Sequence, residues 1–396
     1  EIFMKRQRFL MLGYAHLPVS RTFSSCAFTQ KAINLAKMLT SMGHEVIYFG
    51  ARGQESEPRI EEYIDSPNFM LIETHTLADI RADYGEGNNL PEANGVGYAW
   101  RTTQFKNDFN AERKKSTLKF YSSCVEWIVK NKRDDDFLLL MQGVYHKPIA
   151  DAVQLYLTCE PGIGYRGSYA PFRAFESRYI QYFTYGGENP KADQDGRYYD
   201  RVIGNYFNPN DFGVSEKKGD YYLFIGRLIL RKGVLTAVSA TKFKNAKLVI
   251  AGQPDLEINL KNLPSNCEYI GQVGWEERKK IMSEAIATFV PTIYLEPFGG
   301  VAVESMLCGT PIITTNFGAF TDYNIDGVTG YKCNTLQDFV DAMDKVKTLD
   351  PKKIREQGMR YSLDNIKHEY QKWFDDLYAQ YESTKNPSLK GWHRVV

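Results

Sequence analysis

The sequence predicts an α/β protein with two domains, each built on a parallel β-sheet. The chain has 396 residues, and a single hydrophobic core usually stops growing at roughly 250–300 residues. Apolar runs alternate with amphipathic segments in the first half, and the same alternation starts again at Asp220. Repeated strand–helix–strand series are typical of parallel sheets covered by helices on their faces.

The first series begins with the apolar stretch 8–14, which predicts a buried strand. Residues 26–43 follow with helical periodicity and end at Gly43, a residue suited to a helix C-terminus. Residues 44–50 predict the next strand, and 136–143 and 152–160 predict two more.

The second series has a strand at 220–227, a helix at 233–243 and a strand at 246–252. It continues with three further strands, and amphipathic or apolar helices between them. The strands are 267–273, 287–294 and 310–316, and the helices are 275–285 and 299–309.

The polar, proline- and glycine-containing stretch 205–220 predicts the boundary between the domains. We expect a first domain over 1–208 and a second over 209–372. A helical pattern covers 353–383 without a marked break. Its end, 373–396, is expected to form a tail that packs back on the first domain.

Composition excludes some classes of protein. The 49 basic and 48 acidic residues give no strong field for nucleic acid. No apolar run approaches the ~18 residues that span a bilayer. The six cysteines lack zinc-like spacing and suit a reducing compartment, so a cytoplasmic location is expected. The basic-aromatic stretch 111–121 leaves peripheral membrane contact open, although such runs are more often solvated helix faces.

The segment 296–311, EPFGGVAVESMLCGTP, brackets a glycine pair with two glutamates. Gly299 and Gly300 allow the backbone of a helix start to approach a ligand, and the free N–H groups there attract anions. Glu304 lies about one turn further on, where a carboxylate can accept hydrogen bonds from ribose hydroxyls. An acidic first turn after a bend is the plain structural alternative.

Two basic residues strengthen the interpretation of an anion site. Arg227 ends the first strand of the second series, and Lys232 follows five residues later. Loops at the carboxyl ends of parallel strands gather at one edge of the sheet, where ligands bind. Arginine and lysine beside a helix start would form a cradle for a diphosphate.

With these residues the sequence resembles a known group. The stretches FIGRLILRKG, EPFGGVAVESMLCGTPIITTNFGAF and DGVTGY are similar to the glycosyltransferase 4 family of retaining GT-B enzymes. The resemblance is specific over about 220–332, and the first domain is similar in pattern alone. It implies two facing Rossmann-like domains with a nucleotide sugar in the cleft between them. The first domain, 1–208, would then lie on the acceptor side, and the second, 209–372, would bind the nucleotide sugar.

The resemblance also implies roles for individual residues. Arg227 and Lys232 would hold the diphosphate, Glu304 the ribose and Glu296 the donor sugar. Backbone groups of the helix start would complete the donor site, at Phe298, Gly299, Gly300 and Val301. The expected reaction is metal-independent transfer of a hexose-like sugar from a nucleoside diphosphate to an acceptor hydroxyl, with no cofactor. The acceptor is a glycan, a lipid-linked sugar, a protein or a small molecule.

The first domain offers weaker candidates. His146 follows a predicted strand end, where it would act as a base or a hydrogen-bond donor near the sugar. Together with His146, the expected catalytic residues are Glu296, Arg227 and Lys232. Glu160 and Tyr165 are candidates for the acceptor side.

Other interpretations remain open at this point. A nucleotide-sugar epimerase or a phosphorylase would use the same fold, and a catalytically silent sugar-nucleotide-binding subunit would keep it without turnover. The GIGYRG stretch, 162–167, matches a dinucleotide fingerprint and favours an oxidoreductase, with Glu188 as its ribose acid. Asp193 and Asp195 mimic a metal-binding D-x-D motif but lie in a polar stretch typical of a loop.

Overall fold

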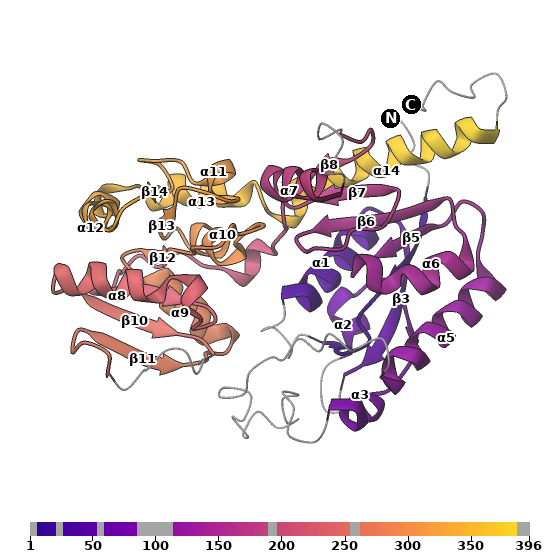
Figure 1. Ribbon diagram of the computed structural model, residues 1–396, viewed down its shortest axis with the longest axis horizontal. Helices are drawn as coiled ribbons and strands as arrows, with labels where there is room; N and C mark the ends of the chain where they lie inside the picture. The colour runs from indigo at the N-terminus through magenta and orange to yellow at the C-terminus, as the bar shows by residue number, and fades with distance from the viewer. Residues whose placement is uncertain are drawn as a thin grey trace.

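The computed structural model describes residues 6–20, 27–53, 59–84, 114–188, 196–253 and 262–385. The chain forms two parallel sheets, each covered by helices, and Figure 1 shows them as two α/β units. This confirms the predicted fold class. The stretches 85–113 and 189–195, which include the D-x-D mimic, lie outside the described residues.

The first sheet has the strand order β2-β3-β1-β5-β6-β7-β8, with β4 paired to β3. Its strands are β1 (Arg8–Leu12), β2 (Pro18–Val19), β3 (Glu45–Arg52), β4 (Phe69–Glu73), β5 (Phe137–Leu140), β6 (Leu157–Ile163), β7 (Phe172–Phe175) and β8 (Arg201–Val202). The strands β1, β5 and β6 are buried along their whole length, as expected for a parallel sheet covered on both faces.

Helices cover both faces of this sheet. They are α1 (Ala27–Ser41), α2 (Ile60–Ile64), α3 (Leu77–Tyr84), α5 (Lys115–Asn131), α6 (Lys147–Val153) and α7 (Arg178–Glu188). One core joins α1 and α2 to the sheet, and a second core joins α5 and α6 to the opposite face. Figure 1 places α7 on the side of the domain that faces the second sheet.

The second sheet has the order β11-β10-β9-β12-β13-β14. Its strands are β9 (Tyr221–Ile225), β10 (Lys247–Ala251), β11 (Cys267–Gly271), β12 (Thr288–Val290), β13 (Ile312–Thr315) and β14 (Gly330–Cys333). Helices α9 (Trp275–Glu284), α10 (Gly300–Leu307) and α13 (Pro351–Met359) pack on one face. Helices α8 (Val234–Phe243) and α12 (Leu336–Lys345) pack on the other, and α11 (Phe320–Tyr323) follows β13.

The predicted single helical segment at the C-terminus is divided in two. Helix α13 ends at Met359, and α14 (Leu363–Lys385) begins after a short break. The break arises because the chain pairs there with the segment that leaves the first domain: Phe207 N–H donates to Tyr361, and Leu363 N–H donates to the Phe207 carbonyl.

Helix α14 packs on the core of the first sheet, and Figure 1 shows it running along that domain. Ile366 and Tyr370 belong to this contact, so the packing begins before residue 373, the expected start of the tail. Tyr370, Trp373 and Phe374 are aromatic side chains of α14 that are almost completely buried there. The chain therefore crosses between the domains twice, once near Phe207 and once near Ser362.

The structure does not support the dinucleotide interpretation of 162–167. A dinucleotide fingerprint must lead from a strand into a helix whose N-terminus holds the pyrophosphate. Here β6 continues to Ile163, and the next element is another strand, β7. None of the described helices combines the length and the apolar character needed to cross a membrane.

Candidate functional site

The loops after β9 and β12 lie against each other at the carboxyl edge of the second sheet. Gly233 has φ +76°, and a Cβ atom there would lie 1.9 Å from the Pro291 carbonyl oxygen. Ile293 N–H donates to the Arg231 carbonyl at 2.9 Å. The close approach that glycine permits therefore fixes the two loops together.

This contact brings two of the predicted site residues into an ion pair. Lys232 Nζ lies 2.7 Å from Glu296 Oε2, with side chains 21% and 11% exposed. Tyr294 packs beside the pair, with Lys232 Nζ 5.0 Å from its ring centroid. Burial, together with the Glu296 charge, raises the pKa of Tyr294 well above its usual value. Arg227 is exposed near this group, close enough to influence the Tyr294 hydroxyl.

Helix α10 begins from a residue in the left-handed conformation. Gly299 precedes the helix with φ +80° and, as a glycine, offers no side chain to cap the first turn. A Cβ atom at Gly299 would lie 2.7 Å from a Phe320 ring carbon, whereas one at Gly300 would meet nothing closer than 3.5 Å. The first N–H groups of a helix have no partner within it, so this half-exposed start can receive an anion.

Phe298 supports this turn from below. Its side chain is 3% exposed and packs against Phe207 and Tyr323. Tyr323 O–H donates to the Phe298 carbonyl at 2.6 Å. The ring is thus part of the core, and Val301 is half-buried on the first turn of α10.

Glu304 is held by a partner that the sequence analysis missed. Arg278 Nη2 of α9 forms an ion pair with Glu304 Oε2 of α10, with side chains 25% and 14% exposed. Arg278 lies in the first turn of α9 and Glu304 in the second turn of α10, and the two helices pack on the same face of the sheet. A contact between residues 26 apart in two helices has no signature in one sequence.

His146 lies in the first domain, where its ring contacts Phe120. The side chain is 1% exposed, and its Nδ1 accepts from Gln142 N–H at 3.4 Å. Burial lowers the pKa of His146 to about 3, an effect that the nearby Gly13 backbone opposes. The ring is therefore neutral near pH 7, with its proton on Nε2.

The structure places Glu160 inside the first domain. It is fully buried and accepts hydrogen bonds from the N–H groups of Tyr169 and Ala170. Tyr165 O–H donates to its other oxygen at 3.0 Å. Burial raises the pKa of Glu160. Glu160 and Tyr165 thus anchor the loop after β6, which is a structural role.

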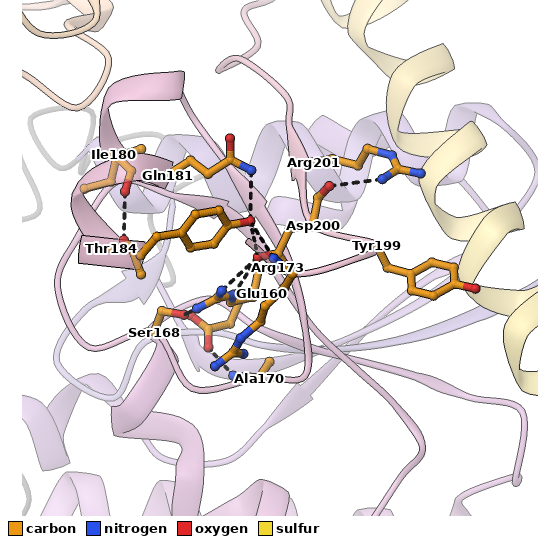
Figure 2. A network of polar contacts seen from close by, with 12 residues as sticks. Glu160, Ser168, Ala170, Arg173, Ile180, Gln181, Thr184, Tyr199, Asp200 and Arg201 are labelled. Atoms are coloured by element: carbon orange, nitrogen blue, oxygen red, sulfur yellow. Dashed lines mark hydrogen bonds and ion pairs between the residues drawn. The ribbon is translucent and has the colours of Figure 1, made fainter. Parts of the chain in front are cut away.

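A buried ion pair lies beside this anchor. Arg173 Nη2 and Asp200 Oδ2 are 2.8 Å apart, and both side chains are fully buried. Tyr185 O–H of α7 donates to the same Asp200 oxygen at 2.9 Å. Figure 2 shows these contacts in one network with Glu160. The network joins β7 and β8 to α7 and thereby fixes the helix nearest the second domain.

The start of α7 touches the turn that precedes α10. Ser177 O–H donates to the Pro297 carbonyl at 2.5 Å, and Arg178 N–H donates to Asp322 Oδ2 at 3.1 Å. Nearby, Lys31 pairs with the buried Glu176. These contacts join residues more than a hundred positions apart, so periodicity and motif spacing could not indicate them.

The structure therefore unites Lys232, Glu296 and the start of α10 on one edge of the second sheet, with Arg227 near Tyr294 at the same edge. Glu304 lies further along, in the second turn of α10, where it pairs with Arg278. His146 lies among first-domain residues, Glu160 is buried, and Tyr165 is half-buried beside it. Within the described ranges, no three histidine, cysteine or carboxylate side chains form a group suited to a metal ion.

A comparison with models of protein families matches the second domain, which carries this edge. The model of the family described as Glycosyl transferases group 1 matches residues 209–361. The second domain is a group 1 glycosyltransferase domain. The match begins in the stretch that predicts the domain boundary and ends at the break between α13 and α14.

Curated relatives resemble the chain over part of its length. An uncharacterized glycosyltransferase of Methanocaldococcus jannaschii is 30% identical over 162 residues, which are 34% of this chain and 41% of that protein. Glycogen synthase of Mycobacterium tuberculosis is 33% identical over 122 residues, or 28% of this chain and 29% of that one. The chain matches less than half the length of these relatives.

Solved structures extend the likeness to both domains. Sucrose-phosphate synthase from Thermosynechococcus elongatus has a TM-score of 0.65 at 17% identity, covering 95% of this chain and 100% of that one. HepE of Anabaena, solved with UDP and glucose, has a TM-score of 0.62 at 14% identity, covering 93% and 99%. The fold is therefore GT-B over nearly the whole chain, which confirms the two-domain architecture implied by the resemblance.

Proposed function

We propose that this protein is a retaining family 4 glycosyltransferase that moves a hexose-like sugar from a nucleoside diphosphate to an acceptor hydroxyl. The observation that carries the proposal is the Lys232–Glu296 ion pair beside the uncapped start of α10. It puts a mobile cation, a carboxylate and free N–H groups at one edge of a group 1 glycosyltransferase domain. These are the groups that a sugar diphosphate requires.

In this proposal the bound donor separates the Lys232–Glu296 ion pair and contacts both side chains. Lys232 turns from Glu296 to the diphosphate, where Arg227 adds a second positive charge. Glu296, released from Lys232, accepts hydrogen bonds from sugar hydroxyls and orients the anomeric carbon. The bond between that carbon and the diphosphate oxygen breaks with its electron pair on the diphosphate. The two cations stabilise the charge that develops there.

The acceptor oxygen then bonds to the anomeric carbon on the face that the diphosphate leaves, and its proton passes to the departing diphosphate. His146 is unsuited to take this proton, because a pKa of about 3 makes it a poor base near neutral pH. Its Nε2 is buried and has no hydrogen-bond partner among the described residues, so it can donate to a sugar oxygen only where that oxygen enters this buried position. Retention itself rests on the resemblance.

We infer that transfer needs no divalent metal, because Arg227, Lys232 and the α10 start together supply positive charge to the diphosphate. Turnover of a nucleotide sugar should therefore persist in excess EDTA. Loss of turnover in EDTA that manganese restores would contradict this.

A thermal-shift panel tests the proposed function and identifies the donor. UDP, GDP and ADP, with their glucose and mannose conjugates where these exist, should be compared. A nucleotide present at 100 times its dissociation constant stabilises the folded state by about 2.7 kcal/mol. We expect one base to shift the melting temperature clearly more than the others. No shift with any of them, at millimolar concentration, would overturn the proposal.

The acceptor is expected to enter from the first domain, near His146. It is a glycan, a lipid-linked sugar, a protein or a small molecule.

The described cysteines are free, which suits a reducing compartment and supports a cytoplasmic site of action.

A further inference from the structure

Arg278 changes what Glu304 can offer to a ligand. The guanidinium holds Oε2 of the carboxylate, and both side chains are only partly exposed. The Nε atom of Arg278 is buried and makes no hydrogen bond to any residue that the structure describes. The position of Arg278 in α9 therefore directs its guanidinium group at Glu304. No second partner among the described residues holds the Nε atom.

A free carboxylate can accept hydrogen bonds from two neighbouring hydroxyls, one at each oxygen. A charge-assisted bond to arginine is among the strongest side-chain hydrogen bonds. With one lone pair of Oε2 occupied by Arg278, Oε1 is the oxygen with its full acceptor capacity left for a ribose hydroxyl. The two hydroxyls of a ribose would then contribute unequally to the binding affinity.

We propose that Arg278 is a positioning residue that makes the protein recognise a ribose through one of its two hydroxyls. This inference rests on the proposed function, in which Glu304 meets the ribose. Arg278 acts through Glu304. It therefore determines which nucleotides are distinguished rather than taking part in sugar transfer.

The experiment compares nucleotides that lack one hydroxyl. Calorimetric titration with UDP, ADP and GDP first identifies the diphosphate that binds most tightly. Its 2′-deoxy and 3′-deoxy forms are then titrated into wild-type protein and Arg278→Met. Methionine keeps an unbranched helix-forming stem but removes the fork. We expect wild-type affinity to fall about tenfold or more for one deoxy form and only a few-fold for the other.

In Arg278→Met both oxygens of Glu304 become available, so both deoxy forms should lose about tenfold or more. Lys280→Met is the matched control. It removes an exposed cation from the same helix, and it should keep the wild-type asymmetry. Arg278→Gln, with the melting temperature of each variant, provides a second test if Arg278→Met does not fold.

The outcomes separate the two proposals. Equal losses for the two deoxy forms in wild-type protein, or an unchanged asymmetry in the Arg278 variants, would overturn this inference alone. Failure of the wild-type protein to bind UDP, ADP or GDP would overturn both the proposed function and the role of Arg278.

Discussion

Both glutamates near the start of α10 hold a basic side chain. Glu296 pairs with Lys232 of the adjacent loop, and Glu304 pairs with Arg278 of the adjacent helix. The pairs differ in what a ligand must do. A diphosphate can draw Lys232 away with its own charge, whereas a ribose is neutral and must share Glu304 with Arg278.

This difference predicts separate effects of two conservative substitutions. Glu304→Gln should weaken the nucleoside diphosphate and the nucleotide sugar by similar factors, because the ribose is common to both. A lost hydrogen bond to a charged group costs about 1.5–3 kcal/mol. Glu296→Gln should keep or slightly raise the affinity for the diphosphate, since it frees Lys232, but should lower turnover because sugar orientation suffers. Titration and turnover assays of both variants measure this.

The reverse pattern, with diphosphate affinity lost in Glu296→Gln and kept in Glu304→Gln, would exchange the two assignments. Wild-type behaviour of both variants would make the carboxylates structural.

The two cations should matter more for turnover than for binding. Arg227→Ala and Lys232→Ala each remove a positive charge from the expected position of the diphosphate, which gains charge as the sugar departs. Loss of one such group commonly lowers turnover about 10²–10³-fold. Lys242→Ala, on the exposed side of α8, is the control and should leave turnover unchanged. Steady-state rates with the cognate donor test this. Wild-type rates in both site variants would contradict the proposal that Arg227 and Lys232 bind the diphosphate.

The turn before α10 depends on one glycine rather than on both. Gly299 adopts a left-handed conformation and abuts Phe320, whereas Gly300 starts the helix with space around it. Gly299→Ala should therefore lower the free energy of unfolding by at least about 1–2 kcal/mol. Gly300→Ala is the matched control and should change it little. Urea unfolding of both variants tests this, and equal stabilities would contradict the role of the left-handed turn.

The sequence could predict most strands and helices of the two sheets, because buried parallel strands and amphipathic helices have clear periods. It could also place Arg227, Lys232, Glu296 and Glu304 near one sheet edge, since loops after parallel strands share that edge. These predictions use information within a few residues of each site.

What it missed depends on distant contacts. The helical pattern of 353–383 gives no sign of the break after Met359, because the break is made by backbone pairing with Phe207. Residues 275–285 indicate a helix, but not that Arg278 would reach Glu304. Glu160 follows the strand pattern of a site residue, yet β6 extends past it and buries it.

The molecule as a whole should lose stability in mild acid. His75 and His146 are each 1% exposed, and burial lowers the pKa of His75 to about 4 and that of His146 to about 3. In the unfolded chain both titrate near 6.5. Below that pH the unfolded state binds protons that the folded state does not. The free energy of unfolding should then fall by up to about 1.4 kcal/mol per histidine for each pH unit between about 6.5 and 4.

Urea unfolding at pH 7, 6, 5 and 4.5 measures this slope. Burial raises the pKa of Glu160 and Asp200, and these groups act in the opposite direction. The comparison with His75→Gln isolates the histidine, because both carboxyls remain in that variant. We expect a shallower slope in His75→Gln, and parallel slopes would show that burial of His75 does not control acid stability.

The double crossing between the domains has a consequence for how the protein is made. A ribosome releases the chain from its N-terminus, so residues 6–202 emerge long before α14. Until then the apolar surface that later receives Tyr370, Trp373 and Phe374 has no cover. The first domain is synthesised first, but it lacks α14 until the whole second domain has been translated. Nascent chains that end before α14 should accordingly depend on chaperones and aggregate without them.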